Sequence, residues 1–188
     1  MASFQDRVIG ALKLQPNTFE EVENDATATG QAATVVIAAA VSGGLVSLIY
    51  LGALGFGSGV IGFVLGLVLK PIGWVVGSWV LLMVGTKLMP GKNTQADLGQ
   101  LLRVTGFAQA PGLFSILGVI PILGILVGLA IAVWTIIAMV IGVKQALDYD
   151  DTVKAVIVCV IAWVIIWIFT AIIGFMGIAG AGLGSRFM

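Results

Sequence analysis

The sequence predicts an all-α polytopic membrane protein with five transmembrane helices, a broken third helix and a short amphipathic N-terminal helix. Three observations point to this class. The 188 residues are 60% hydrophobic and only 10% charged, whereas a globular domain has about 25% charged residues. The mean hydropathy is +1.15. The apolar residues also gather in runs of about 20 residues, the length that a helix needs to cross a membrane.

Residues 1–30 are expected to form a cytosolic amphipathic and acidic segment. Apolar residues recur at helical spacing in residues 1–14, which predicts a helix that lies on the membrane surface or packs on the protein's own loops. The apolar residues on that face are Phe4, Val8, Ile9 and Leu12. A second short helix is expected at 18–24, where an acidic run favours a solvated face. The segment lacks the pattern of a signal peptide.

Residues 31–175 are expected to form the five-span membrane domain, followed by a short glycine-rich tail at 176–188. Four spans are plainly apolar and long enough to cross a hydrocarbon core of about 30 Å. They are the first, second, fourth and fifth, expected at about 31–51, 60–88, 122–143 and 153–175.

The third helix, expected at about 95–110, is less apolar than the others. It carries Arg103, Thr105 and Gln109, so this side should face other helices rather than lipid. Pro111 and Gly112 then interrupt it. The sequence leaves open whether this element crosses the membrane fully or re-enters, which would reduce the number of spans to four.

Lys70 is a charge within the second span, and Pro71 beside it is expected to kink the helix. An intramembrane lysine marks a functional site by default. Lys87 marks the inner end of the span, and the 17 residues between them place Lys70 roughly 25 Å away along the axis. Two placements follow: the side chain snorkels to the far interface, or it finds a polar partner inside the bundle.

The candidate polar site within the membrane therefore draws on the second and third helices. Its residues are Lys70, Arg103, Thr105, Gln109, Pro111 and Gly112. Discontinuous helices often mark substrate sites in transporters. Candidate counter-charges at the inner mouth are Asp97, Asp148, Asp150 and Asp151. The alternative is a packing kink with internally paired polar groups, in which Arg103 snorkels inward or pairs with the carboxylates of 148–151. Gln109 and the Pro111–Gly112 break lie deeper than Arg103.

No catalytic, cofactor or metal site is expected, so the chain is not predicted to be an enzyme. It has no histidine, and its one cysteine, Cys159, lies in an apolar run without a neighbouring base. The aspartates of 148–151 lack the glycine and glutamate of an EF-hand, which favours a solvated loop over a calcium or magnesium site. The net charge of zero argues against a nucleic-acid partner.

Basic residues predict the orientation. With five spans and a cytoplasmic N-terminus, the outer side holds only Arg186, joined by Lys70 if it snorkels, which agrees with the positive-inside rule. The basic residues on the inner side are Arg7, Lys13, Lys87, Lys92, Lys144 and Lys154.

Several stretches occur in an order that is informative as a whole. They are GFAQAPG at 106–112, DRVIGALKLQPNTFEEVEND at 6–25, TGQA at 29–32, VGTK at 84–87 and VKQALD at 143–148. This pattern resembles the bacterial branch of the Yip-one domain family, small multi-span membrane proteins related to the Ypt/Rab-interacting proteins. The resemblance covers most of the chain. It implies a five-span fold with a cytosolic N-terminus, and we expect the bacterial inner membrane as the location.

For eukaryotic members, the resemblance implies vesicle traffic, contact with prenylated small GTPases and self-association. This sequence lacks the Asp-Leu-Tyr-Gly-Pro motif typical of that branch, and its N-terminal region has only about 30 residues, so GTPase binding is not carried over to it. The expected function is non-enzymatic organisation of membrane lipid or partner proteins. The alternative is a small transporter, channel or lipid-moving protein that uses the broken third helix. The expected partners are membrane lipids, a protein at the cytosolic face and, because five short spans enclose little interior, further copies of the chain.

Overall fold

The computed structural model describes residues 2–120 and 122–184, and every regular element within them is a helix. Four helices are long and apolar enough to cross a membrane. They are α3 (Ala28–Gly52), α4 (Phe56–Met83) with its continuation η1 (Val84–Leu88), α6 (Leu123–Ala146) and α7 (Thr152–Gly184). The predicted all-α membrane class is therefore confirmed, and these helices correspond to the first, second, fourth and fifth expected spans.

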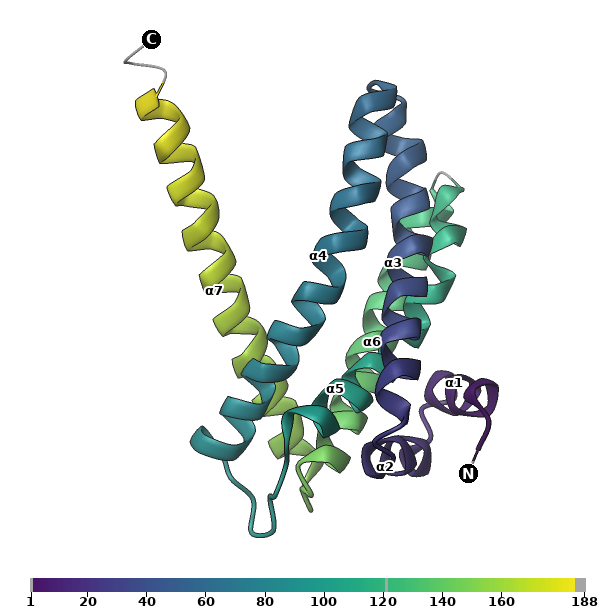
Figure 1. Ribbon diagram of the computed structural model, residues 1–188, viewed down its shortest axis with the longest axis vertical. Coiled ribbons are helices and arrows are strands. Elements are labelled where there is room, and N and C mark those ends of the chain that lie inside the picture. Colours follow the sequence, from purple (N-terminus) through teal and green to yellow (C-terminus); the bar gives the residue numbers. More distant parts are fainter. Residues whose placement is uncertain (1, 121, 185–188) are drawn as a thin grey trace.

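Two short helices precede the first long one, at one end of the bundle (Figure 1). They are α1 (Phe4–Leu12) and α2 (Pro16–Asn24). Ser3 caps α1, because its hydroxyl accepts from the backbone N–H of Asp6 while the Asp6 carboxylate accepts from the N–H of Ser3. Pro16 occupies the first turn of α2, where its missing N–H has no intrahelical role.

The expected third helix at 95–110 and the segment that follows its break form two short helices of different type. The α-helix α5 (Leu98–Phe107) begins at Asp97, whose carboxylate accepts from the N–H of Gln100 while the Gln100 amide oxygen accepts from the N–H of Asp97. A 3-10 helix, η2 (Ala110–Val119), follows, with Pro111 in its first turn. Neither helix alone is long enough to cross a membrane.

Small residues bring α5 and η2 close to α3. A Cβ placed on Gly106 would lie 2.7 Å from the Cβ of Ala32, and one placed on Gly112 would lie 3.0 Å from the Cβ of Ala39. The two segments run in the same direction. Ala39 lies seven residues after Ala32 on α3, and its neighbour Gly112 lies six residues after Gly106. Glycine at both positions permits this approach.

Hydrogen bonds between α3 and η2 continue this parallel alignment to the far end of α3. The Ser42 hydroxyl donates to the carbonyl of Leu113 and accepts from the N–H of Ile116, both over 2.9 Å. The Tyr50 hydroxyl lies 3.3 Å from the carbonyl of Gly118. Thus α5 and η2 together follow α3 over most of its length.

The polar connectors meet at the end of the bundle that holds α1 and α2. The Tyr149 hydroxyl lies within hydrogen-bond distance of the carbonyls of Gly85 and Met89, and the Lys154 ammonium donates to the carbonyl of Pro90. We call this region, formed by α1, α2 and residues 89–97 and 147–151, the connector end. The residues expected at the inner face lie at or near it: Arg7, Lys13, Lys87, Lys92, Lys144 and Lys154.

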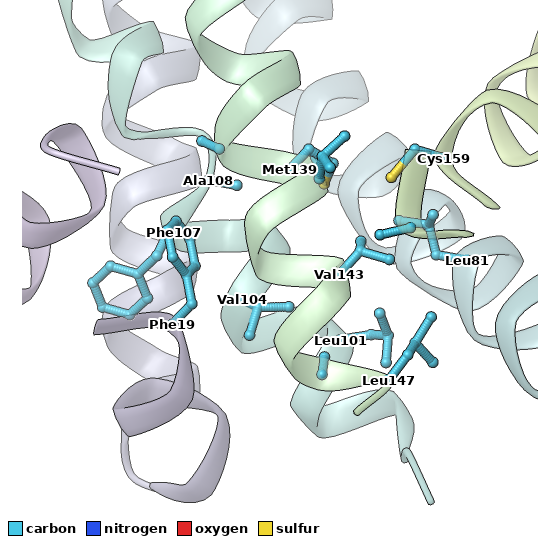
Figure 2. Packing of buried hydrophobic residues seen from close by; sticks show 14 of the residues in the cluster. Phe19, Leu81, Leu101, Val104, Phe107, Ala108, Met139, Val143, Leu147 and Cys159 are labelled. Atoms are coloured by element: carbon cyan, nitrogen blue, oxygen red, sulfur yellow. The ribbon is translucent and has the colours of Figure 1, made fainter. Parts of the chain in front are cut away.

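A cluster of buried hydrophobic residues lies beside the connector end (Figure 2). Phe19 of α2 and Val104 of α5 are fully buried there. Gly142 of α6 makes room for both, because a Cβ at that position would come within 3.1 Å of the Phe19 ring and 3.2 Å of Val104. The short helices are therefore fixed against α6 by close packing.

The opposite half of the bundle is more open. Figure 1 shows α4 and α7 close together toward the connector end and diverging away from it. They still meet at the level of Gly77, where an added Cβ would lie 3.8 Å from Cδ1 of Ile166. The helix α7 continues to Gly184, through most of the segment expected as a glycine-rich tail. Arg186 lies outside the described residues.

Candidate functional site

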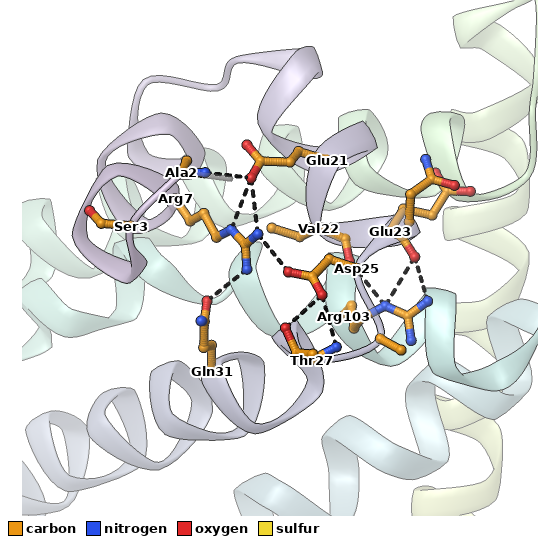
Figure 3. Close-up of polar contacts among 12 residues, drawn as sticks. Ala2, Ser3, Arg7, Glu21, Val22, Glu23, Asp25, Thr27, Gln31 and Arg103 are labelled. Atoms are coloured by element: carbon orange, nitrogen blue, oxygen red, sulfur yellow. Dashed lines mark hydrogen bonds and ion pairs between the residues drawn. The ribbon is translucent and has the colours of Figure 1, made fainter.

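Arg103 binds backbone carbonyls at the connector end. Its Nε donates to the carbonyls of Val22 and Glu23 over 3.0 Å, and Nη2 also donates to Glu23 (Figure 3). These carbonyls belong to the last turn of α2, where no intrahelical donor is available. No carboxylate of 148–151 lies within ion-pair distance of Arg103 in the described part of the chain. Arg103 therefore fastens α2 to α5.

Arg7 forms a second polar cluster that the sequence did not reveal. Its guanidinium is 2% exposed and donates to Glu21 over 2.9 Å, to Asp25 over 2.6 Å and to Gln31 over 3.1 Å (Figure 3). The planar fork of arginine suits several acceptors at once. Because its partners lie on α2, at the start of α3 and between them, Arg7 ties three helices together. These partners lie 14 to 24 residues after Arg7 in the sequence. No local sequence pattern therefore predicts the contacts.

The carboxyl groups at the connector end differ in their pKa values. Hydrogen bonds from Thr27 and Arg7 lower the pKa of Asp25 to about 2. The backbone N–H of Ala2 and the Arg7 guanidinium lower the pKa of Glu21. By contrast, burial and the charges of nearby carboxylates, Asp148 first, raise the pKa of Glu23 to about 7.

A different arrangement occurs in a cavity of about 300 Å³ between α4, α5, α6 and α7, which we call the central cavity. Three of the predicted site residues line it, namely Lys70, Thr105 and Gln109. Trp74 and Ser78, one and two turns beyond Lys70 on α4, contribute to the same wall. The structure therefore brings together part of the predicted polar site and leaves Arg103 outside it.

The wall formed by Thr105 is hydrogen-bonded within itself. Its hydroxyl accepts from the indole N–H of Trp74 over 3.0 Å and lies 2.7 Å from the Ser78 hydroxyl. It also lies 2.6 Å from the carbonyl of Leu101 and can donate to it. This wall is fixed in place and offers few free polar groups.

Lys70 and Gln109 differ from that wall. Within residues 2–120 and 122–172, no side chain or backbone group is hydrogen-bonded to either side chain, and no carboxylate lies within 4.0 Å of the Lys70 ammonium. In the same part of the chain, no fully buried side-chain nitrogen or oxygen lacks a partner. The free donors of Lys70 therefore reach open space.

Lys70 lies near the middle of the bundle. It is the fifteenth of the 28 residues of α4, and its Nζ is 3.3 Å from the place that a Cβ on Gly112 would take. Gly112 in turn packs on Ala39, the twelfth of the 25 residues of α3. The side chain thus points inward, midway along two long apolar helices. An isolated charge at such a depth in a bilayer costs about 2.5–3.5 kcal/mol or more.

The four predicted counter-charges lie away from the central cavity. Asp97 caps α5, and the Asp151 carboxylate accepts from the N–H of Val153 at the start of α7. Asp148 and Asp150 are exposed at the connector end. In the part of the chain that the structure describes, no group of three histidine, cysteine, aspartate or glutamate side chains could hold a metal ion.

Two apolar hollows lie elsewhere on the bundle. One, of about 660 Å³, is lined by α3, η2 and α6 and includes Gly43, Gly118 and Gly128. The other, of about 320 Å³, lies between α1 and α3 and includes Val8 and Ala38. Their walls are almost entirely hydrocarbon, so they suit acyl chains better than polar solutes.

One of three comparisons with known proteins finds a match. The Yip1 domain matches residues 9–174, which are 166 of the 188 residues. Comparisons with curated proteins and with solved structures find no match. The match extends from within α1 into α7 and confirms the resemblance to the Yip-one domain family. With four helices able to cross a membrane, the chain is an integral membrane protein, and it belongs to the Yip1 domain family.

Proposed function

We propose that this chain is a non-enzymatic protein of the bacterial inner membrane that crosses the bilayer five times and organises membrane lipid. The fifth crossing is formed by α5 and η2. Ten residues of α-helix and ten of 3-10 helix extend over about 35 Å, enough for a hydrocarbon core of about 30 Å. Their parallel contacts along α3 support this, because α3 is itself long enough to cross.

The connector end faces the cytoplasm in this proposal. The concentration of lysine and arginine there supports that orientation. Residues 1–30 then form the cytosolic segment and residues 31–175 the membrane domain. The helix α1 lies at the membrane surface as an amphipathic helix, with Phe4 and Ile9 exposed toward lipid.

The larger apolar hollow, between α3, η2 and α6, is the main support for the proposal that the protein organises lipid. Gly43, Gly118 and Gly128 remove side chains from three neighbouring elements at the same place. In a bilayer such a space is filled by acyl chains, since an empty space forfeits dispersion contacts. The protein thereby holds particular lipid chains in fixed positions. The connector end and the diverging α4 and α7 are the surfaces that we assign to a cytosolic protein partner and to further copies of the chain.

Filling the hollow tests this function. Added Cβ atoms at Gly43 and Gly128 meet no atom within 4 Å, so replacing both glycines with leucine fills the space without a backbone clash. Gly57→Leu is the matched control, because it is equally free of neighbours and lies outside the hollow. Native mass spectrometry after mild extraction should show fewer retained lipids for the double variant and no change for the control. Equal lipid retention in all three proteins would contradict the proposal.

The central cavity supports a second candidate, a lipid-moving or transport activity. Free polar groups of Lys70 and Gln109 lie halfway along the spans, beside the 3-10 helix. Polar residues at that depth commonly line pathways. Proteoliposomes should then move fluorescent lipid between leaflets faster than empty liposomes, and Gln109→Leu should slow the movement. Movement no faster than in empty liposomes would remove this candidate.

A further inference from the structure

We infer that the central cavity binds the anionic group of a membrane amphiphile, with Lys70 and Gln109 as the residues that contact it. The inference depends on the proposed position of these helices in the bilayer. It requires neither acyl chains in the larger hollow nor lipid movement between leaflets.

The charge balance of the cavity is the first argument. Lys70 brings an ammonium group into the middle of an apolar bundle, and no carboxylate in the described part of the chain lies within 4.0 Å of it. Attraction between opposite charges is strong where water is scarce. An anion that enters the cavity from outside the chain would gain this attraction in full.

The donors around the cavity define the chemistry of that anion. Lys70 offers three N–H donors and Gln109 two more, together with one carbonyl acceptor. No described residue uses them. A carboxylate or phosphate has two or more acceptor oxygens and forms short, charge-assisted hydrogen bonds with such donors. The shared chemistry is therefore an oxyanion.

The site is prepared before a ligand arrives. The hydrogen bonds among Trp74, Ser78 and Thr105 hold the wall that continues from Lys70 toward Thr105. Gly112, which packs on Ala39 of α3, leaves room for the ammonium, since a Cβ there would approach Nζ to 3.3 Å. Binding to such a wall requires little ordering of side chains.

The rest of the lining points to an amphiphile rather than a soluble ion. The remaining wall is largely apolar and includes Met139, Trp163 and Ile166. Away from the connector end, α4 and α7 diverge beside the cavity (Figure 1), and Trp167 on α7 is 73% exposed. A volume of about 300 Å³ holds a headgroup or carboxylate, while an acyl chain would lie along the exposed apolar sides of α4 and α7.

Quenching of tryptophan fluorescence tests the inference, because Trp74 and Trp163 line the cavity. The purified full chain in detergent is titrated with brominated phosphatidylglycerol, brominated stearate and brominated phosphatidylcholine. The two anionic probes should reach half-maximal quenching at concentrations about tenfold lower than the zwitterionic probe, as expected for one charge-assisted contact. Equal concentrations for all three probes would overturn the inference.

Variants connect the preference to the cavity. Lys70→Gln should abolish the difference between anionic and zwitterionic probes, Lys70→Arg should keep it, and Gln109→Leu should reduce it. Lys87→Gln is the matched control, since Lys87 follows α4 but is exposed at the connector end. A preference that survives Lys70→Gln, or that disappears with Lys87→Gln, would overturn the inference.

Inorganic phosphate identifies the source of the oxyanion. Phosphate at millimolar concentration should leave quenching by the anionic lipid unchanged, because it lacks an acyl chain. Displacement of the lipid by phosphate would overturn the assignment to an amphiphile. If Lys70→Gln does not fold, Gln109→Leu carries the test alone. The quenching experiment could fail while the Gly43 and Gly128 leucine variant still retains fewer lipids. That result would overturn the anion site and leave the proposed function intact.

Discussion

The cations at the connector end and in the central cavity have opposite surroundings. Arg7 contacts two carboxylates and an amide oxygen, and Arg103 contacts the last carbonyls of α2. Lys70 has no such partner in the described part of the chain. Charges that are fully paired hold helices together, whereas a charge left unpaired at depth is available to a ligand.

Removing the best-paired cation should have the largest effect on stability. Arg7→Ala leaves Glu21 and Asp25 without their shared partner and removes the side-chain hydrogen bonds of Arg7 that join α1 to α2 and α3. We expect a loss of about 3 kcal/mol in the free energy of unfolding, the lower end of the range for one partner of a buried pair, because the Glu21 side chain is 36% exposed. Denaturation with sodium dodecyl sulfate, followed by circular dichroism, measures it. Lys13→Ala, at an exposed residue of the same segment, should change stability by less than about 0.5 kcal/mol.

Arg103 should contribute less, because its partners are neutral carbonyls. Arg103→Ala should lower the free energy of unfolding by about 2 kcal/mol, and Arg103→Lys should lose about half as much, since one charged donor remains. The same denaturation experiment applies, with hydrogen exchange at Val22 and Glu23 as a local measure. Unchanged exchange at the end of α2 in Arg103→Ala would show that these hydrogen bonds are not needed.

The raised pKa of Glu23, about 7, predicts a pH dependence. The folded state binds the proton more tightly than the unfolded state, whose carboxyl has a pKa near 4.5. Stability should therefore fall as pH rises from about 5 to about 7 and then level off, by about 1 kcal/mol after allowance for solvent screening. Thermal unfolding at pH 5.5 and pH 8 measures the change. Glu23→Gln should remove this dependence, so a persisting slope would assign it to another group.

Replacing Lys70 should change the free energy of unfolding least, and in the opposite direction from the arginine variants. Lys70→Met removes a charge without breaking an ion pair, so the free energy of unfolding should stay the same or rise by about 1 kcal/mol or less. Denaturation in zwitterionic detergent isolates this effect from anionic ligands. A loss as large as that of Arg7→Ala would show that Lys70 has a structural partner and would end the contrast.

The membrane fold could be predicted from the sequence because four long apolar runs dominate it. The third segment was harder, since Pro111 and Gly112 signalled an interruption but not the 3-10 helix that follows. Its contacts along α3 depend on tertiary packing. The order of several short stretches also indicates the Yip-one domain family, and the Yip1 domain match over residues 9–174 confirms that family.

The candidate site was predictable in part. Lys70, Thr105 and Gln109 stand out as polar residues in apolar runs, and they do meet in one cavity. Arg103 stands out equally, yet it binds the end of α2, a contact between residues about 80 positions apart that no periodicity encodes. The same holds for Arg7, whose partners lie 14 to 24 residues further along the chain.

The stabilisation that anionic lipid provides tests the contrast most directly. A ligand that binds the folded state raises the melting temperature, so phosphatidylglycerol should raise that of the wild type more than phosphatidylcholine does. Arg7→Ala should start from a lower melting temperature and keep this increment, while Lys70→Gln should start near the wild-type value and lose it. An increment that Lys70→Gln retains, or that Arg7→Ala loses while still folded, would contradict the assignment of Lys70 to ligand binding and of Arg7 to structure.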